Sequence, residues 1–93
     1  MLLKSFIVQN SYGIHARPAR LIVETASKFQ SDISLEKNGE MINAKSIMGI
    51  LMLEARKDSE LILRIQGVDE EPAMNALTEV FERITTLREW ENI

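Results

Sequence analysis

The chain of 93 residues contains no cysteine, which excludes disulfide bonds and metal sites built on thiolates. It also lacks an apolar run of the roughly 20 residues that a membrane-spanning helix needs, so we expect no membrane insertion. There is no basic stripe and the formal net charge is −3, so we expect no nucleic-acid partner, because phosphate neutralisation requires clustered Lys and Arg. The first ten residues are too short and too polar for a signal peptide, and we expect a cytoplasmic protein.

The sequence also has no repeats, low-complexity tracts or linkers. Hydrophobic residues make up 45% and charged residues 27% of the chain, a balance typical of globular rather than disordered proteins. A chain of this length is large enough to bury one core. We therefore expect residues 1–93 to form a single domain.

The apolar pattern changes its period several times along the chain. Short alternating or β-rich runs predict strands over residues 2–9, 32–37, 40–44 and 60–66. Apolar residues spaced three and four apart predict a helix from residue 16 to Phe29 and a longer last helix from Asp69 to Leu87. The apolar run 46–53 suits a buried strand or a short helix, and Ser46 as an N-cap favours the helix.

The order of these elements is strand, helix, strand, strand, helix, strand, helix. Each strand is short and has one apolar face, so one sheet with helices on one side is the natural arrangement, an α+β two-layer sandwich. Asn38-Gly39 between two strands predicts a tight hairpin, because both residues accept positive φ. At least part of the sheet is therefore antiparallel.

His15, the only histidine, stands directly before the first predicted helix. Gly13 gives the chain a flexible approach, and Pro18 fits within the first helical turn. Unpaired N–H groups and the helix dipole stabilise an anion placed on or beside the ring. Arg17 could turn its guanidinium toward the same anion, and Arg20 adds positive potential one turn further on.

Other interpretations of His15 stay open at this point. A lone histidine near a helix start is most often a surface or capping residue. Hydrolysis by a Ser-His-carboxylate set that includes Ser11 is conceivable, but no nucleophile-elbow motif supports it. No second histidine or cysteine exists to complete a metal site, and we expect neither a metal nor a cofactor.

Three stretches of the sequence together resemble one known family. Residues 13–19, GIHARPA, resemble the active-site signature of HPr, the histidine-containing phosphocarrier of the bacterial phosphoenolpyruvate:sugar phosphotransferase system. Residues 26–29, ASKF, and 45–49, KSIMG, agree at the right distance, and the Asn38-Gly39 hairpin fits as well. The resemblance covers nearly the whole chain.

The resemblance implies an open-faced sandwich of order βαββαβα, with a four-stranded antiparallel sheet and three helices on one face. It implies that His15 accepts a phosphoryl group on Nδ1 from phosphorylated enzyme I and passes it to IIA domains of sugar permeases. Arg17 would stabilise the group in transit. Such a protein is a phosphoryl-transfer carrier rather than a stand-alone catalyst.

Ser46 has a structural and a functional interpretation. A serine before a short helix is most often an N-cap. The resemblance implies that it is also the target of an ATP-dependent HPr kinase/phosphorylase, with a transcriptional regulator as a further partner. A phosphate at a helix N-terminus is compatible with the fold, so the added charge would instead change which surfaces can approach.

The run that follows Ser46 has more apolar residues than one face of a short helix can bury. We expect part of it to form an exposed docking patch. The resemblance implies that Ile47, Met48 and Leu51 contact enzyme I, the IIA domains and the kinase. We expect three basic residues to surround this patch and to favour acidic partners, namely Arg17, Arg20 and Lys45. Deeper burial and a dimer contact are the alternatives, and we expect a monomer.

Three functions remain open from the sequence. The first is a carrier for sugar uptake, and the second is a regulatory phosphocarrier whose phosphorylation state signals carbon or nitrogen status. The third is a binding module that acts through a phosphoserine, a class that typically lacks the active histidine, so His15 counts against it. Departures from the family pattern, such as Asp58 at a turn where glycine is frequent and a tail over residues 88–93, leave the chemistry intact.

Overall fold

The computed structural model of the protein describes residues 1–11 and 13–86. Leu87, which we expected to end the apolar stripe of the last helix, and the tail 88–93 lie outside the described residues. Seven elements follow one another along the chain: β1 (Leu2–Ile7), α1 (Ala16–Ala26), β2 (Asp32–Lys37), β3 (Glu40–Asn43), α2 (Ile47–Met52), β4 (Glu60–Gln66) and α3 (Glu70–Thr86).

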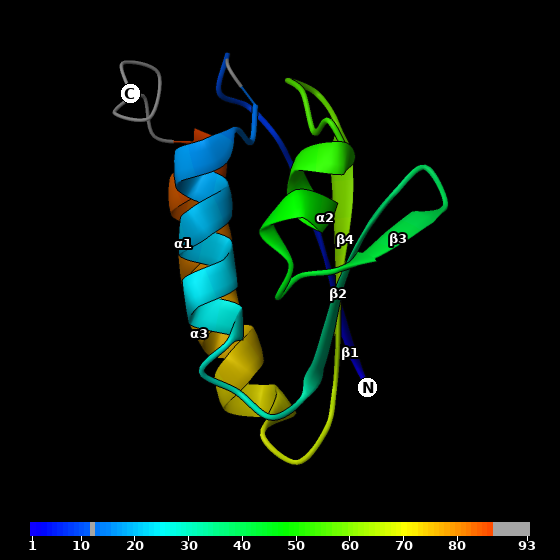
Figure 1. The fold of residues 1–93 in the computed structure, drawn as a ribbon, viewed down its shortest axis with the longest axis vertical. Helices are drawn as coiled ribbons and strands as arrows, with labels where there is room; N and C mark the ends of the chain where they lie inside the picture. The colour runs from blue at the N-terminus through cyan, green and yellow to red at the C-terminus, as the bar shows by residue number, and fades with distance from the viewer. Residues whose placement is uncertain (12, 87–93) are drawn as a thin grey trace.

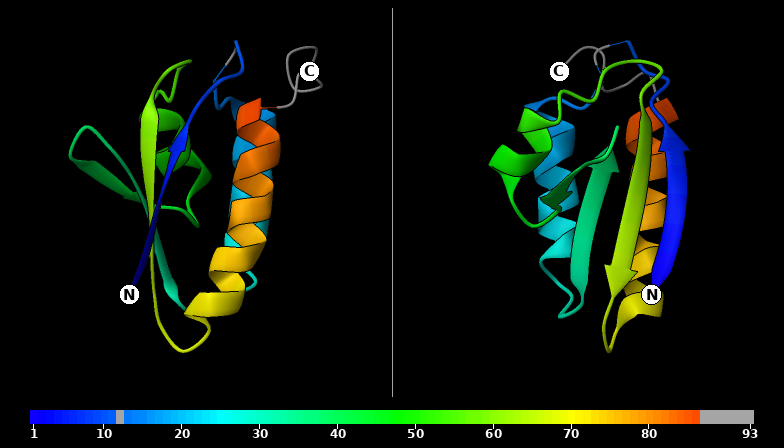
Figure 2. Two further views of the ribbon diagram at one scale, coloured as in Figure 1. Left: turned by 180° about the vertical axis from the view of Figure 1, so that it is seen from behind. Right: turned by 90° about the vertical axis from the view of Figure 1, so that its right-hand side faces the viewer.

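The four strands form one antiparallel sheet in the order β1-β4-β2-β3. All three helices lie on the same side of the sheet, and its other face is open (Figures 1 and 2). The predicted open-faced sandwich of order βαββαβα is therefore confirmed.

The core lies between the sheet and the pair of helices α1 and α3, which run side by side (Figure 2). Alternate residues of the central strands β2 and β4 point into it and are buried: Ile33, Leu35, Leu61, Leu63 and Ile65. The edge strand β1 adds Phe6, whose ring stacks on that of Phe81 in α3 with centroids 5.0 Å apart.

The structure ends β1 and α1 two and three residues earlier than the sequence predicts, and β3 ends at Asn43 rather than at residue 44. β1 ends at Ile7, although Val8 still donates its N–H to the carbonyl of Ser59, just before β4. Gln9 then donates to the carbonyl of Thr85 in α3, so the chain leaves the sheet for the helical layer at this residue. α1 ends at Ala26, and the chain continues in tighter turns in which Phe29 donates to the carbonyl of that residue and still packs on the core.

Both predicted tight turns are confirmed. Asn38 and Gly39 have φ of 51° and 84°, as the hairpin between β2 and β3 requires. Asp58 has φ of 74° in the turn before β4, so this aspartate adopts the left-handed backbone that glycine usually provides.

Candidate functional site

His15 is the N-cap of α1. Its backbone is extended, with φ −102° and ψ −166°, and its carbonyl accepts the first helical hydrogen bond from Ala19 at 2.9 Å. The half-buried imidazole makes no capping hydrogen bond to the helix. The ring therefore does not itself cap the amide groups of the first turn.

The electrostatics of this helix end favour an anion. The first turn of α1 contains no acidic residue that would repel it. Arg17 and Arg20 are exposed, and neither guanidinium forms an ion pair within the described part of the chain. Their charge is therefore available to a group that approaches from outside.

The loop that delivers His15 to α1 is held against the segment that follows α2. Ile14 donates its N–H to the carbonyl of Ala55 at 2.8 Å. Gly13 has φ +67°, and a Cβ atom at this position would lie 2.2 Å from the same carbonyl oxygen. The start of α1 and the end of α2 therefore lie at the same end of the molecule (Figure 1).

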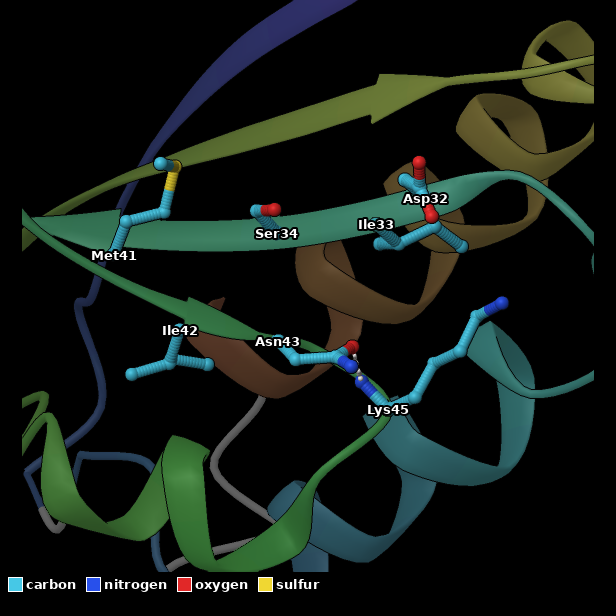
Figure 3. A pocket seen from close by; sticks show the side chains of 7 residues that line it. All are labelled: Asp32, Ile33, Ser34, Met41, Ile42, Asn43 and Lys45. Carbon is cyan, nitrogen blue, oxygen red and sulfur yellow. Dashed lines mark hydrogen bonds between the residues drawn. The ribbon is translucent and has the colours of Figure 1, made fainter.

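Lys45 is not at that end. Its ammonium donates a 2.8 Å hydrogen bond to the carbonyl of Phe29, beyond the C-terminal end of α1, and its side chain extends toward this end of the helix (Figure 3). The helix α1 separates this lysine from His15. Lys45 therefore lies beside the start of α2 rather than beside His15, and the ring of cations around the docking patch stays a prediction.

An open hollow of about 490 Å3 lies along the β2–β3 pair (Figure 3), and His15 is not among the residues that line it. Its lining mixes carboxylate, hydroxyl, amide and apolar groups: Asp32, Ile33, Ser34, Met41, Ile42, Asn43 and Lys45. None of these residues belongs to the site at the start of α1. His15 instead stands at an exposed helix end, which suits transfer between two protein surfaces.

The helix α2 divides its apolar residues between the core and the surface. Ile50 and Leu53 are buried, whereas Met48 and Met52 are 64% and 70% exposed. Two further residues, Ile47 and Leu51, are half-buried. The expected exposure of part of this run is thus confirmed, whereas its docking role stays a prediction, and we call Ile47, Met48, Leu51 and Met52 the α2 apolar patch.

Ser46 is the N-cap of α2, as predicted. Its hydroxyl oxygen accepts a 3.1 Å hydrogen bond from the N–H of Gly49. The side chain is half-buried, so the hydroxyl is not enclosed by the core.

No helix in the described part of the chain is both long and apolar enough to cross a membrane. Among residues 1–11 and 13–86, no cluster of three or more His, Cys, Asp or Glu side chains could hold a metal ion.

Comparison with known proteins identifies the family. The family model described as the PTS HPr component phosphorylation site matches residues 3–83. The chain belongs to the HPr family, the phosphocarriers of the phosphotransferase system. Phosphocarrier protein HPr of Xylella fastidiosa (strain 9a5c) is 48% identical over 82 residues, which are 88% of this chain and 92% of that protein.

Solved HPr-like structures share the fold. HPr-C-His from Thermoanaerobacter tengcongensis superposes with a TM-score of 0.86 at 42% identity, over 95% of this chain and 99% of that one. Crh, a catabolite repression protein of Bacillus subtilis described as a domain-swapped dimer, superposes with a TM-score of 0.71 at 38% identity, over 94% and 100%.

Two residues of this HPr-family chain could not be assigned a role from the sequence. Asn10 and Lys37 both donate hydrogen bonds from their side chains to backbone carbonyls beside the site. Asn10 and Gly13 have the spacing of the first and last residues of a β-turn, a pattern that predicts such a turn and so indicates a role for Asn10. The partners of Lys37 lie 16 and 17 residues away, and no local pattern indicates them.

Proposed function

We propose that this HPr-family protein accepts a phosphoryl group on Nδ1 of His15 from phosphorylated enzyme I and passes it to IIA domains of sugar permeases. The observation that carries the proposal is the position of the imidazole. It stands at the N-cap of α1 and makes no capping bond, and no acidic residue lies in the first turn. A nucleophilic nitrogen and an anion-binding helix end are thereby placed side by side.

The chemistry needs positioning and charge rather than a cofactor. The lone pair on Nδ1 of His15 forms the new P–N bond, while the bond from phosphorus to the donor atom breaks and its electron pair stays on the donor. Delivery to an acceptor repeats the exchange in the opposite direction. The three equatorial oxygens carry negative charge throughout, and Arg17 together with the first N–H groups of α1 supplies the donors that stabilise it.

The α2 apolar patch serves as the docking surface for both kinds of partner. Met48 and Met52 are exposed and flexible, and methionine adapts to partners of different shape. Arg17 and Arg20 add positive charge on the neighbouring helix, which favours acidic partner surfaces. Lys45 contributes less to this attraction, because its ammonium is bound to the carbonyl of Phe29.

Phosphorylation of Ser46 by an ATP-dependent kinase is the regulatory part of the proposal, with a transcriptional regulator as its reader. The hydroxyl is half-buried at the start of α2, directly beside the patch residues Ile47 and Met48. A phosphate there adds a charge of about −2 next to the docking surface and repels acidic partners. Incubation with ATP and a cognate kinase tests this, and incorporation into both the wild type and Ser46→Ala would reject this serine as the target.

A regulatory carrier that moves no sugar is the second candidate function, favoured by the similarity to Crh. Both candidates use the same chemistry at His15, and capture of the phosphorylated protein with permease IIA domains separates them. Within either function, we propose a cytoplasmic monomer with one domain over residues 1–93.

The carrier proposal is tested with enzyme I and labelled phosphoenolpyruvate. We expect acid-labile label on the wild type and none on His15→Ala. Label that the alanine variant retains would move the site elsewhere. The role of Arg17 in stabilising the phosphoryl group is tested with Arg17→Lys, which keeps the positive charge and loses the planar guanidinium. We expect this variant to accept label more slowly.

A further inference from the structure

Asn10 is a polar residue inside the protein that the proposed chemistry does not use. It is only 3% exposed. Its side-chain Nδ2 donates a 2.8 Å hydrogen bond to the carbonyl of Gly13, and the N–H of Gly13 donates back to the carbonyl of Asn10 at 3.3 Å. The two bonds close the turn that leads to His15. The start of this turn is anchored as well, since Gln9 donates its N–H to Thr85 in α3.

The peptide group between Gly13 and Ile14 is held at both of its polar ends. Its carbonyl accepts from Asn10, and its N–H donates to the carbonyl of Ala55 at 2.8 Å. Rotation of this peptide would break both bonds in an environment where Gly13 and Ile14 are buried. His15 follows Ile14 directly, so the peptide plane just before the histidine is fixed.

The second polar atom of the Asn10 amide, Oδ1, is not satisfied in the same way. The orientation of the amide is set by its partner, since the carbonyl of Gly13 can only accept. Oδ1 is thereby buried, and it has no hydrogen-bond partner in the part of the chain that the structure describes. An apolar residue would avoid this unfavourable burial but could not hold the carbonyl.

We infer that Asn10 is a positioning residue for phosphoryl transfer at His15, an inference that rests on the proposed function of this histidine. The side chain acts through the Gly13–Ile14 peptide, which it holds fixed directly before His15 and thereby limits the movement of the backbone that carries the imidazole. In-line transfer between two proteins depends on such alignment, because a displacement of the nucleophile by about 1 Å can slow a reaction by roughly a hundredfold.

The test measures phosphoryl transfer from phosphorylated enzyme I to variants of this residue. Asn10→Asp keeps the size of the side chain and removes the donor to Gly13, and Asn10→Ser keeps a shorter donor. We expect kcat to fall about tenfold or more for Asn10→Asp and less for Asn10→Ser. KM for enzyme I should stay within about twofold, because the α2 apolar patch is unchanged. Asn75→Asp, an exposed change of the same charge on α3, is the matched control and should behave as wild type.

A merely structural role is excluded by a second comparison. The comparison variant is Ile33→Val, which weakens the core of the sheet away from the loop. Its kcat is measured at a temperature at which its folded fraction has fallen as much as that of Asn10→Asp. Equal kcat losses in these two variants, or an unchanged kcat in Asn10→Asp, would overturn the inference. A wild-type protein that takes no label at all would instead refute the proposed function, so the two failures are distinguishable.

Discussion

A Cβ atom on Gly13 would lie 2.2 Å from the carbonyl oxygen of Ala55. The approach is this close because that oxygen also accepts the N–H of Ile14 at 2.8 Å, which draws the loop before His15 onto the segment after α2. The absence of a side chain at residue 13 is therefore a condition for the geometry of the site.

Gly13→Ala should destabilise the protein through both a strained backbone and a steric clash. Gly39→Ala is the matched control, because its φ is also positive, +84°, but nothing lies within 4 Å of the added atom. We expect a loss of about 1 kcal/mol in the free energy of unfolding for the control. The loss at Gly13 should exceed this by about 2 kcal/mol or more, as measured by urea denaturation. Equal losses at the two glycines would contradict the close approach.

Lys37→Met should loosen the end of α2. The Lys37 ammonium donates 2.8 Å hydrogen bonds to the carbonyls of Leu53 and Glu54, which have no partners inside the helix. Methionine keeps the apolar stem and loses both bonds, so we expect the free energy of unfolding to fall by about 1–2 kcal/mol, with faster amide exchange in α2. The exposed Lys57→Met serves as control. A Lys37 variant as stable as this control would show that the two bonds contribute nothing.

The contact between Asp69 and Ser31 should make the stability depend on acid. Hydrogen bonds from the Ser31 hydroxyl and then from the N–H of Gln30 hold the pKa of the Asp69 carboxyl below its ordinary value of 3.8. The folded state thus binds this proton less readily than the unfolded state. The stabilisation is fully present above the ordinary pKa and is lost as the pH falls through the lower pKa of the folded protein.

We therefore expect Asp69→Asn to be less stable than wild type at pH 7, with the difference shrinking below about pH 4. The measurement is urea denaturation at several pH values, repeated with Ser31→Ala and with the double variant. The two changes should be strongly non-additive at pH 7, because they break one network. Additive losses, together with a difference that does not vary with pH, would rule out the coupling.

Met48→Glu should weaken docking without touching the chemistry. It places a carboxylate in the α2 apolar patch, which we expect to raise KM for enzyme I about tenfold, or roughly 1.4 kcal/mol, while kcat changes little. Met41→Glu is the matched control, since Met41 is 56% exposed in β3 and lies outside the patch. The patch would lose its assigned role if both variants raised KM equally.

The elements of the fold were largely predictable from the sequence because each has a local cause. β2 and β4 are bounded as predicted, since alternating apolar residues and the flanking turns define them. The N-cap at Ser46 and the positive φ of Asn38 also follow from the chemistry of single residues. The strand order β1-β4-β2-β3 does not follow from such local chemistry, because pairing between distant strands leaves no local pattern.

The candidate site was predictable only in part. The place of His15 at the start of α1 followed from the helical period and Pro18. Two hydrogen bonds hold the loop before it: Asn10 donates to the carbonyl of Gly13, and Ile14 donates to the carbonyl of Ala55. The sequence did not predict them, because a backbone carbonyl accepts whatever the type of its residue. The hydrogen bond from the Lys45 ammonium to the carbonyl of Phe29, at the far end of α1, could not be predicted for the same reason.

The central claim is that the imidazole of His15 carries the phosphoryl group, and phosphorus NMR of the protein after reaction with enzyme I and phosphoenolpyruvate tests it most directly. The account predicts a phosphorus signal coupled to the ring protons of His15 in the pattern of Nδ1 substitution. The signal should disappear in acid and be absent from His15→Ala. A signal assigned to another side chain, or one that persists in the alanine variant, would contradict the account.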